Sequence, residues 1–320
     1  MGKKSRQKRE RRELGQQSKA LGKFHQVWEI PYPKYQRDLY TRFYMGLGEI
    51  RNHVFPKKED QKPFDDLFEP MFENLREMNH ARTECIDLIN DYVKGVENGK
   101  YVVLEEKGRV MDQVAFDMPS VRIKKTIDME LNFYFKAFFV RGNSALECLN
   151  KLANNVLGVN LSFFFAGKDE DFEKKLESLL KKNPKAIPDW AIKDIRVHRK
   201  DWGQSFKGMR NDICHDGFML PKIAFGLNEH GRIVFSLPHF NNGSMETIFN
   251  DLWHFVFNFC EMMVAVLLAQ KLSPPSGLII FPEDMRDKKL PVKYRLGSLP
   301  QENLFPIDVP DGQHSGILNL

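Results

Sequence analysis

The stretch LWHFVFNFCEMMVAVLLAQ, residues 252–270, decides the fold. It is apolar over about eighteen residues, which approaches the length of a helix that crosses a bilayer. Three polar residues interrupt it, namely His254, Asn258 and Glu261. A glutamate at the bilayer centre costs about 2.5–3.5 kcal/mol, whereas a helix buried in a bundle shows the same pattern without that cost. We therefore expect a core helix from about 244 to 272, and we weigh a membrane span as the less favoured alternative.

Two further helices are indicated upstream of this segment. A long one is expected over residues 120–157, with Ser120 able to cap its start. Gly142 lies inside this helix, where it allows a close contact or a mild kink. The run DEDFEKKLESLLKK, residues 169–182, is typical of an amphipathic helix.

A third upstream helix is expected over residues 187–217, with Pro188 near its first turn and Gly217 beyond its end. The run KIAFGLNEHGRIVFSL, residues 222–237, is typical of a β-hairpin. Together these patterns predict an all-α fold, in which a four-helix bundle over residues 119–272 carries a small inserted β-hairpin before its last helix.

The two ends of the chain are less regular. Prolines at positions 31, 33, 56 and 63 break the first part into short pieces, and residues 70–98 then follow a helical period. Seven prolines between Pro274 and Pro310 indicate an extended arm that is packed on the body or partly disordered. We therefore divide the chain into a basic disordered tail at 1–20, an N-terminal helical extension at 21–118, the bundle at 119–272 and an extended C-terminal arm at 273–320.

The positive charge of the chain is concentrated at its start. The chain of 320 residues has 48 basic and 43 acidic side chains, and its formal net charge is +5. The first thirteen residues hold two acidic residues and seven basic ones: Lys3, Lys4, Arg6, Lys8, Arg9, Arg11 and Arg12. The rest of the chain is therefore neutral, which argues against a globally basic nucleic-acid-binding protein. The tail can contact RNA phosphates, and the alternative is a solvated start that aids solubility.

The spacing of the cysteines and the N-terminal sequence indicate the cellular compartment of the protein and whether a metal site is expected. The four cysteines, at positions 85, 148, 214 and 260, are widely scattered and form no C-x-x-C pair. We expect reduced thiols in a cytoplasmic protein, with no metal and no other cofactor. No apolar segment typical of a secretory signal follows the basic start, and Arg6 stands where a myristoylation signal requires Ser or Thr.

The sequence GMRNDICHDG, residues 208–217, lies on the helix expected at 187–217. At 100° per residue, the apolar residues Trp202, Phe206, Met209 and Ile213 form one stripe, which must face the core. A second stripe, with Gln204, Gly208, Asn211 and His215, lies on nearly the opposite side. His215 is therefore not a core histidine. It is either a functional group or a residue at the helix end that is bonded locally to Asp212 or Asn211.

Gly208 favours a partner on this polar side. A glycine inside a helix costs about 0.5–1 kcal/mol relative to alanine, and the approach of a second helix would explain that cost. Arg210 lies about 140° around the helix from His215, so one helix does not easily aim both side chains at one phosphate. Two copies related by a two-fold axis can bring both side chains into one cleft, and we expect a homodimer.

The segment from Arg210 to His215 resembles the R-x(4–6)-H motif of HEPN domains in its R-N-x-x-x-H form. The run NFYFKAFFVRGNSALECLNKL, residues 132–152, is similar to the long first helix of such bundles. The resemblance covers roughly residues 119–272 and implies an all-helical, usually dimeric domain. Many members of the family are metal-independent endoribonucleases of toxin, anti-phage or RNA-processing systems. A second match to the motif, from Arg232 to His239, lies in the expected hairpin, where the helical context is missing.

The resemblance implies RNA cleavage by attack of a ribose 2′-hydroxyl. His215 would transfer the proton, Arg210 would stabilise the scissile phosphate, and Asn211 would orient the phosphate or the imidazole. Asp212 would fix the tautomer of the imidazole, and Gly208 would support a close approach. The alternative is a non-catalytic dimeric module of the same type that binds a nucleotide, a nucleic acid or a protein partner such as an antitoxin or regulator. An unrelated helical protein remains a third possibility.

Overall fold

The computed structural model describes residues 39–98, 104–106, 109–111, 115–116, 125–156, 158–161, 164, 168–182, 187–215, 217–221, 223–230, 232–240, 243–273, 276–287 and 291–298. The described chain is mostly helical with a few short strands, so the expected all-α class is confirmed. The predicted basic tail at 1–20 lies outside the described residues, as do parts of the N-terminal extension and of the C-terminal arm.

The α-helices are α3 (Gly48–Val54), α4 (Lys58–Glu97), α5 (Ile127–Asn155), α6 (Asp169–Lys182), α7 (Asp189–His198), α8 (Gln204–His215) and α9 (Met245–Ala269). Two π-helical segments, η1 (Thr41–Leu47) and η3 (Arg199–Gly203), and a 3₁₀ turn, η4 (Glu283–Met285), complete the helical elements. The strands form two-stranded antiparallel pairs: β1 (Leu104–Glu106) with β2 (Arg109–Met111), β3 (Ala115–Phe116) with β4 (Lys125–Thr126), β5 (Ala224–Leu227) with β6 (Ile233–Ser236), β7 (His239–Phe240) with β8 (Gly243–Ser244), and β9 (Ser276–Ile280) with β10 (Tyr294–Ser298).

Helix α9 is the central core helix that its apolar sequence predicts. The Ser244 hydroxyl caps its start by accepting a hydrogen bond from the Thr247 amide at 3.1 Å. Among the described helices, α9 alone is long and apolar enough to cross a membrane by length and composition, and 78% of its apolar window is buried inside the protein. Its polar interruptions are paired: Arg42 donates from Nε to Glu261 Oε1 at 2.9 Å and from Nη2 to Asn258 Oδ1 at 2.7 Å.

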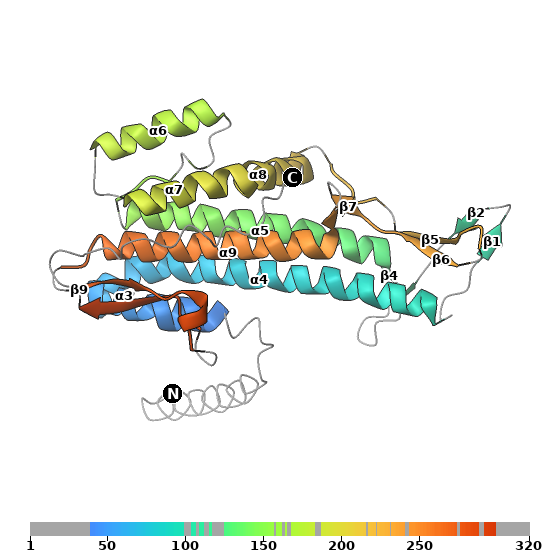
Figure 1. Ribbon diagram of the computed structural model, residues 1–320, viewed down its shortest axis with the longest axis horizontal. Coiled ribbons are helices and arrows are strands. Elements are labelled where there is room, and N and C mark those ends of the chain that lie inside the picture. The colour runs from blue at the N-terminus through green and yellow to red at the C-terminus, as the bar shows by residue number, and fades with distance from the viewer. Residues whose placement is uncertain are drawn as a thin grey trace, which may run out of the picture.

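The bundle differs in membership from the sequence-based prediction. Helices α4, α5, α9 and the continuous rod α7–η3–α8 lie side by side and share one core (Figure 1). The expectation that 169–182 would supply a bundle helix was wrong, because α6 buries only Phe172 and Leu176 and lies outside the others. Helix α4, which we assigned to a separate N-terminal extension, takes its place. The core therefore runs across the expected boundary at 118/119.

Helix α4 also continues where the sequence predicts a break. Pro63 and Pro70 both lie inside its 40 residues. An interior proline removes one backbone hydrogen bond and costs about 3 kcal/mol. The phenylalanines of this segment, Phe64, Phe68 and Phe72, are buried in the core, and each contributes roughly 1.5–3 kcal/mol on burial. Packing therefore outweighs the local signal of the prolines, and the helix begins at Lys58 rather than near residue 70.

The start of α5 also differs from the prediction. The helix begins at Ile127, and Lys125–Thr126 pairs as a strand with Ala115–Phe116. Ser120, the expected cap, lies outside the described residues. The close contact expected at Gly142 is present, because a Cβ placed there would lie 2.6 Å from Phe206 Cζ and 2.8 Å from Met78 Sδ. Gly142 thus lets α5 pack tightly against α4 and α8.

Two hairpins flank the bundle. The hairpin predicted at 222–237 is confirmed as β5–β6, whose Phe225 and Phe235 rings pack against Tyr92 of α4. The described part of the C-terminal arm is a second hairpin, β9–β10, which lies against η1 and α3. Gly46 permits this docking, because a Cβ there would lie 2.8 Å from Val292 Cγ1.

Candidate functional site

The R-N-x-x-x-H motif lies on α8, at the end of the rod formed by α7, η3 and α8. The π-helical turns of η3 end at Gly203, so an α-helical register holds throughout Gln204–His215. Trp202, Phe206 and Ile213 are buried and Met209 is partly buried, which confirms the predicted apolar stripe. The motif residues consequently point away from the core.

The end of α8 is fixed by the chain that follows it. Gly217 adopts a left-handed conformation, with φ of 66°, and the Phe218 amide donates to the Asp212 carbonyl at 3.2 Å. The Phe218 ring then stacks on Phe135 of α5, with ring centroids 5.5 Å apart. The helix therefore ends where Gly217 predicts, and the turn returns the chain to the core immediately after His215.

Two side chains of α5 hold the segment that leaves α8. Asn132 Oδ1 accepts a hydrogen bond from the Leu220 amide at 3.5 Å, and Asp128 Oδ1 accepts one from the Ile223 amide at 3.1 Å. These contacts tie the chain after the motif to the first two turns of α5. The position of His215 is thus set from both sides, by the apolar stripe before it and by this tether after it.

Arg210 faces α5. Its Nη1 donates to Asn211 Oδ1 at 3.2 Å, and its Nη2 lies 4.0 Å from Glu147 Oε1 on α5. The same carboxylate oxygen accepts a hydrogen bond from Asn143 Nδ2 at 2.7 Å. A line of polar side chains therefore crosses the surface between α5 and α8, formed by Asn143, Glu147, Arg210 and Asn211. The Arg210 side chain is 29% exposed, which leaves it open to an anion from solvent.

His215 is exposed at the end of α8. Within the described part of the chain it makes no hydrogen bond or ion pair, so the local bonds to Asp212 or Asn211 that we considered are not formed. Asp212 is also exposed. The structure brings Arg210 and Asn211 together but does not join either of them to His215, in agreement with the angular offset along the helix.

Gly208 has open space around it. A Cβ at this position would meet no atom of the described residues within 4 Å, so none of the described helices explains the glycine. The competing motif match is not helical, because Arg232 precedes strand β6 and His239 begins β7. The seven basic tail residues at positions 3–12 lie outside the described residues.

Sequence reasoning missed Asn143 and Glu147. They follow Gly142, the position at which α5 comes into close contact with Phe206 of α8. The available signal was a glycine inside a long helix, followed within five residues by polar side chains. Such a glycine indicates where α8 crosses α5 and hence which side chains of α5 reach the motif.

An exposed apolar surface lies beside the end of α8. Met129 and Phe133 are one turn apart on α5 and are 65% and 63% exposed, and Met219 is 68% exposed. Asn132 Nδ2 lies 3.8 Å from Met219 Sδ, which places Met219 next to this part of α5. Large apolar side chains gathered on one surface are typical of a protein–protein contact.

The sequence predicted reduced thiols and no dedicated metal site. All four cysteines are free thiols, with Cys85 and Cys260 buried, Cys148 partly buried and Cys214 exposed. Burial raises the pKa of the Cys85, Cys148 and Cys260 thiols. In the part of the chain that the structure describes, no group of three or more His, Cys, Asp or Glu side chains could hold a metal ion.

A second polar cluster lies between α9 and the C-terminal hairpin. Burial lowers the pKa of Lys293. The nearby Glu261 carboxylate raises this pKa, whereas the positive charge of Arg42 lowers it further. Burial also raises the pKa of the neighbouring Tyr294. Arg42 of η1 binds both oxygens of Glu261 of α9, which ties η1 to α9 next to the buried Tyr294.

Comparison with protein-family models, with curated proteins and with solved structures found no match for this chain.

Proposed function

We propose that the protein is a HEPN-like, metal-independent endoribonuclease that cleaves RNA through attack of a ribose 2′-hydroxyl. The observation that carries the proposal is the placement of Arg210, Asn211 and His215 on one helix, outside its buried apolar stripe. None of the three packs in the core or closes the end of the helix. Arg210 contacts only Asn211 and the exposed Glu147 among the described residues, so all three side chains remain within reach of a ligand from solvent.

The chemistry assigns a role to each group. The 2′-oxygen attacks the adjacent phosphorus, the bond from phosphorus to the 5′-oxygen breaks, and the products carry a 2′,3′-cyclic phosphate and a 5′-hydroxyl. His215 accepts the proton of the 2′-hydroxyl or donates a proton to the leaving 5′-oxygen, since an imidazole exchanges protons near neutral pH. Arg210 stabilises the charge that develops on the phosphate oxygens. Asn211 orients the phosphate and keeps contact with Arg210, and by the resemblance Asp212 would orient the imidazole after the two exposed side chains turn toward each other.

The site is completed in a homodimer. Arg210 faces α5 while His215 stands at the helix end, so one chain does not aim both at one phosphate. The exposed surface formed by Met129, Phe133 and Met219 lies beside the end of α8, and the open space around Gly208 leaves room for another helix. A two-fold axis near this surface would bring His215 of one copy toward Arg210 of the other. By resemblance, such an enzyme belongs to toxin or anti-phage systems, with an antitoxin or regulator as its partner.

A second candidate follows from Glu147. Its carboxylate occupies the side of Arg210 that a phosphate would use, and it adds negative charge to the site. Such an arrangement also suits a non-catalytic dimeric module that binds a nucleotide, a nucleic acid or a protein. Binding without cleavage by the wild-type protein would favour this second function.

The test is cleavage of a labelled RNA by the purified protein, with a DNA of the same sequence and an RNA methylated at every 2′-oxygen as controls. We expect cleavage of the unmodified RNA alone, cyclic phosphate ends, and full activity in EDTA. His215→Ala should abolish cleavage and Arg210→Ala should reduce it strongly, each at a stability cost within about 1 kcal/mol. His230→Ala, which removes an exposed histidine on the β5–β6 turn, serves as the matched control. Normal cleavage by His215→Ala would exclude the proposed mechanism.

A further inference from the structure

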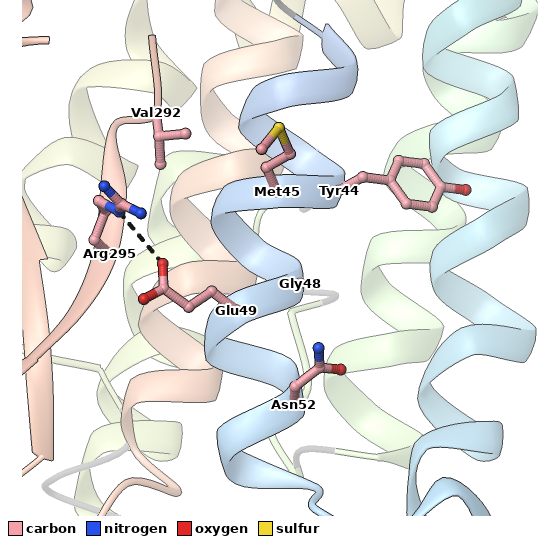
Figure 2. Close-up of a pocket in the computed structure, with 7 residues that line it drawn as sticks. All are labelled: Tyr44, Met45, Gly48, Glu49, Asn52, Val292 and Arg295. Atoms are coloured by element: carbon pink, nitrogen blue, oxygen red, sulfur yellow. Dashed lines mark hydrogen bonds and ion pairs between the residues drawn. The ribbon is translucent and has the colours of Figure 1, made fainter. Parts of the chain in front are cut away.

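A pocket lies on the opposite side of the bundle from α8, between η1–α3 and strand β10 (Figure 2). Its volume is about 350 Å³, within the range of small-molecule sites. Its lining residues are Tyr44, Met45, Gly48, Glu49, Asn52, Val292 and Arg295. Met45, Asn52 and Arg295 are exposed, so the pocket opens to solvent.

Gly48 is the first sign that this space has a use. It has helical dihedral angles, φ −63° and ψ −38°, within the continuous helix formed by η1 and α3. A glycine in such a position is less stable than an alanine. Gly46 has a packing reason, because Val292 would clash with a Cβ, but a Cβ on Gly48 would meet no atom of the described chain within 4 Å. Gly48 therefore keeps the floor of the pocket empty, although the packing of the described residues does not require a glycine at this position.

The polar groups around the floor have unused hydrogen-bonding capacity. Arg295 Nε donates to Glu49 Oε2 at 3.3 Å, the contact drawn in Figure 2. Within the described residues, this contact leaves Glu49 Oε1 and both terminal nitrogens of Arg295 without a partner. The third group, Asn52, has its oxygen occupied, since Arg51 donates to Asn52 Oδ1 from Nε at 3.2 Å and from Nη2 at 2.8 Å. Its amide nitrogen remains available as a donor only.

The rest of the lining is apolar. Met45 and Val292 stand on either side of the opening in Figure 2, and the Met45 side chain is 46% exposed. A thioether makes favourable contacts with aromatic rings and adapts to their shape. The Tyr44 ring points away from the pocket toward α4, where its hydroxyl donates to Glu69. The pocket thus offers apolar contact from a sulfur and a branched side chain, with polar groups at one edge.

We propose that this pocket binds a guanine base. The ring faces contact Met45 and Val292. The N1–H and N2–H groups of guanine donate to the Glu49 carboxylate, and its O6 and N7 acceptors receive hydrogen bonds from Arg295 and Asn52. A free guanine nucleotide and an unpaired guanine in RNA present the same edge.

Other ligand classes fit less well. A bare phosphate would meet the negative charge of Glu49. A purely apolar ligand would bury the Arg295 and Glu49 charges without replacing their contacts with water. Adenine is read most specifically by an amide that both accepts and donates, and the oxygen of Asn52 is already occupied by Arg51. Guanine is the base whose N–H groups pair with one carboxylate acceptor while its O6 and N7 accept from separate donors of the protein.

The test is calorimetric titration of the intact protein with GMP, AMP and inorganic phosphate. We expect GMP to bind about tenfold or more tightly than AMP, and phosphate neither to bind in this pocket nor to compete with GMP. Gly48→Leu places a side chain in the pocket at a position where a Cβ meets no described atom within 4 Å, and it should abolish GMP binding while the melting temperature does not fall. Glu49→Gln should weaken GMP binding about tenfold or more with no loss of fold, since its ion pair is exposed.

Gly208→Leu is the matched control, because it adds the same side chain to a helical glycine with equally open space and should leave GMP binding unchanged. His215→Ala should also bind GMP as the wild type does, so this result is independent of RNA cleavage. A uridine oligonucleotide with one central guanine separates the sources: tighter binding than GMP identifies a base in RNA, and equal or weaker binding identifies a free nucleotide. Absence of GMP binding, equal binding of AMP, competition by phosphate, or unchanged binding by Gly48→Leu would each overturn the proposal.

Discussion

Arg210 of α8 lies beside Glu147 of α5, with Nη2 of the arginine 4.0 Å from Oε1 of the carboxylate. Glu147 also accepts a hydrogen bond from Asn143, which holds the carboxylate in place. The arginine that we assign to phosphate binding is therefore partly neutralised in the free protein. Any phosphate that reaches Arg210 must displace Glu147 or share the arginine with it.

Removal of this carboxylate should strengthen RNA binding. Exposed ion pairs contribute roughly 0.2–1 kcal/mol, so Glu147→Gln should lower the Kd for a single-stranded RNA by a factor between about 1.4 and about 5 at low salt. Fluorescence anisotropy with a cleavage-resistant 2′-O-methyl RNA measures this effect. Glu173→Gln is the control, since it removes an exposed carboxylate paired with Arg196 at a distance from the motif. An equal gain in both variants would reflect net charge alone and would contradict a specific role of Glu147.

Two glycines should respond to alanine with opposite signs. At Gly142, a Cβ would lie 2.6 Å from Phe206 Cζ, and such overpacking costs roughly 1–3 kcal/mol. At Gly208 the space is open, and Gly208→Ala should stabilise the fold by about 0.5–1 kcal/mol through helix propensity. Urea unfolding of the two variants measures both free energies. Destabilisation by Gly208→Ala at high dilution would mean that a neighbour within the chain contacts this position.

The sequence predicted the parts of the fold in which local and tertiary preferences agree. Residues 169–182 form α6 with the expected bounds, α9 begins at its Ser244 cap, and α8 buries its predicted stripe. The prediction failed at α4, where prolines give a local signal that the burial of phenylalanines overrides. It failed again for α6, since periodicity shows that a helix is amphipathic but not which partner covers its apolar face.

The candidate site was predicted in part. Helical spacing was sufficient to place His215 and Asn211 away from the core, because the register of α8 is regular. The contact between Arg210 and Glu147 depends on where α8 crosses α5, and that crossing is set by side-chain packing at Gly142 and Phe206. Spacing along one helix carries no information on such a crossing, so the competing carboxylate could not be predicted from the motif.

The four cysteines should differ in reactivity. Cys214 is exposed beside His215, whereas burial raises the pKa of Cys85 and Cys260 and so removes their reactive thiolate form. Native protein treated with iodoacetamide at pH 8 should therefore be modified at Cys214 first and at the partly buried Cys148 more slowly. Peptide mass spectrometry follows the two rates, and unfolding in urea should expose all four. Rapid native labelling of Cys260 would contradict the burial of α9.

The basic tail should add affinity for RNA and no catalytic group. Its seven basic side chains release counterions when they contact phosphates, so deletion of residues 2–12 should weaken RNA binding and flatten its salt dependence. Single-turnover cleavage at saturating protein should be unchanged, because the segment contains no histidine. Binding with the same affinity and the same salt slope would assign the tail to solubility alone.

The exposed apolar surface beside α8 should be the dimer contact. Phe133 is 63% exposed and lies one turn from Met129, so Phe133→Asp puts a charge into the proposed interface without touching the core. We expect the wild type to be a dimer by light scattering at micromolar concentration, and Phe133→Asp to be a monomer with a similar melting temperature. Its RNA cleavage should fall with the dimer fraction, because His215 and Arg210 then no longer meet across the two-fold axis. Met285→Asp, which places the same charge on an exposed apolar residue of η4 in the C-terminal arm, is the control. A fully active monomer would show that one chain completes the site, and the offset between Arg210 and His215 would then have to be closed by movement of the arginine side chain.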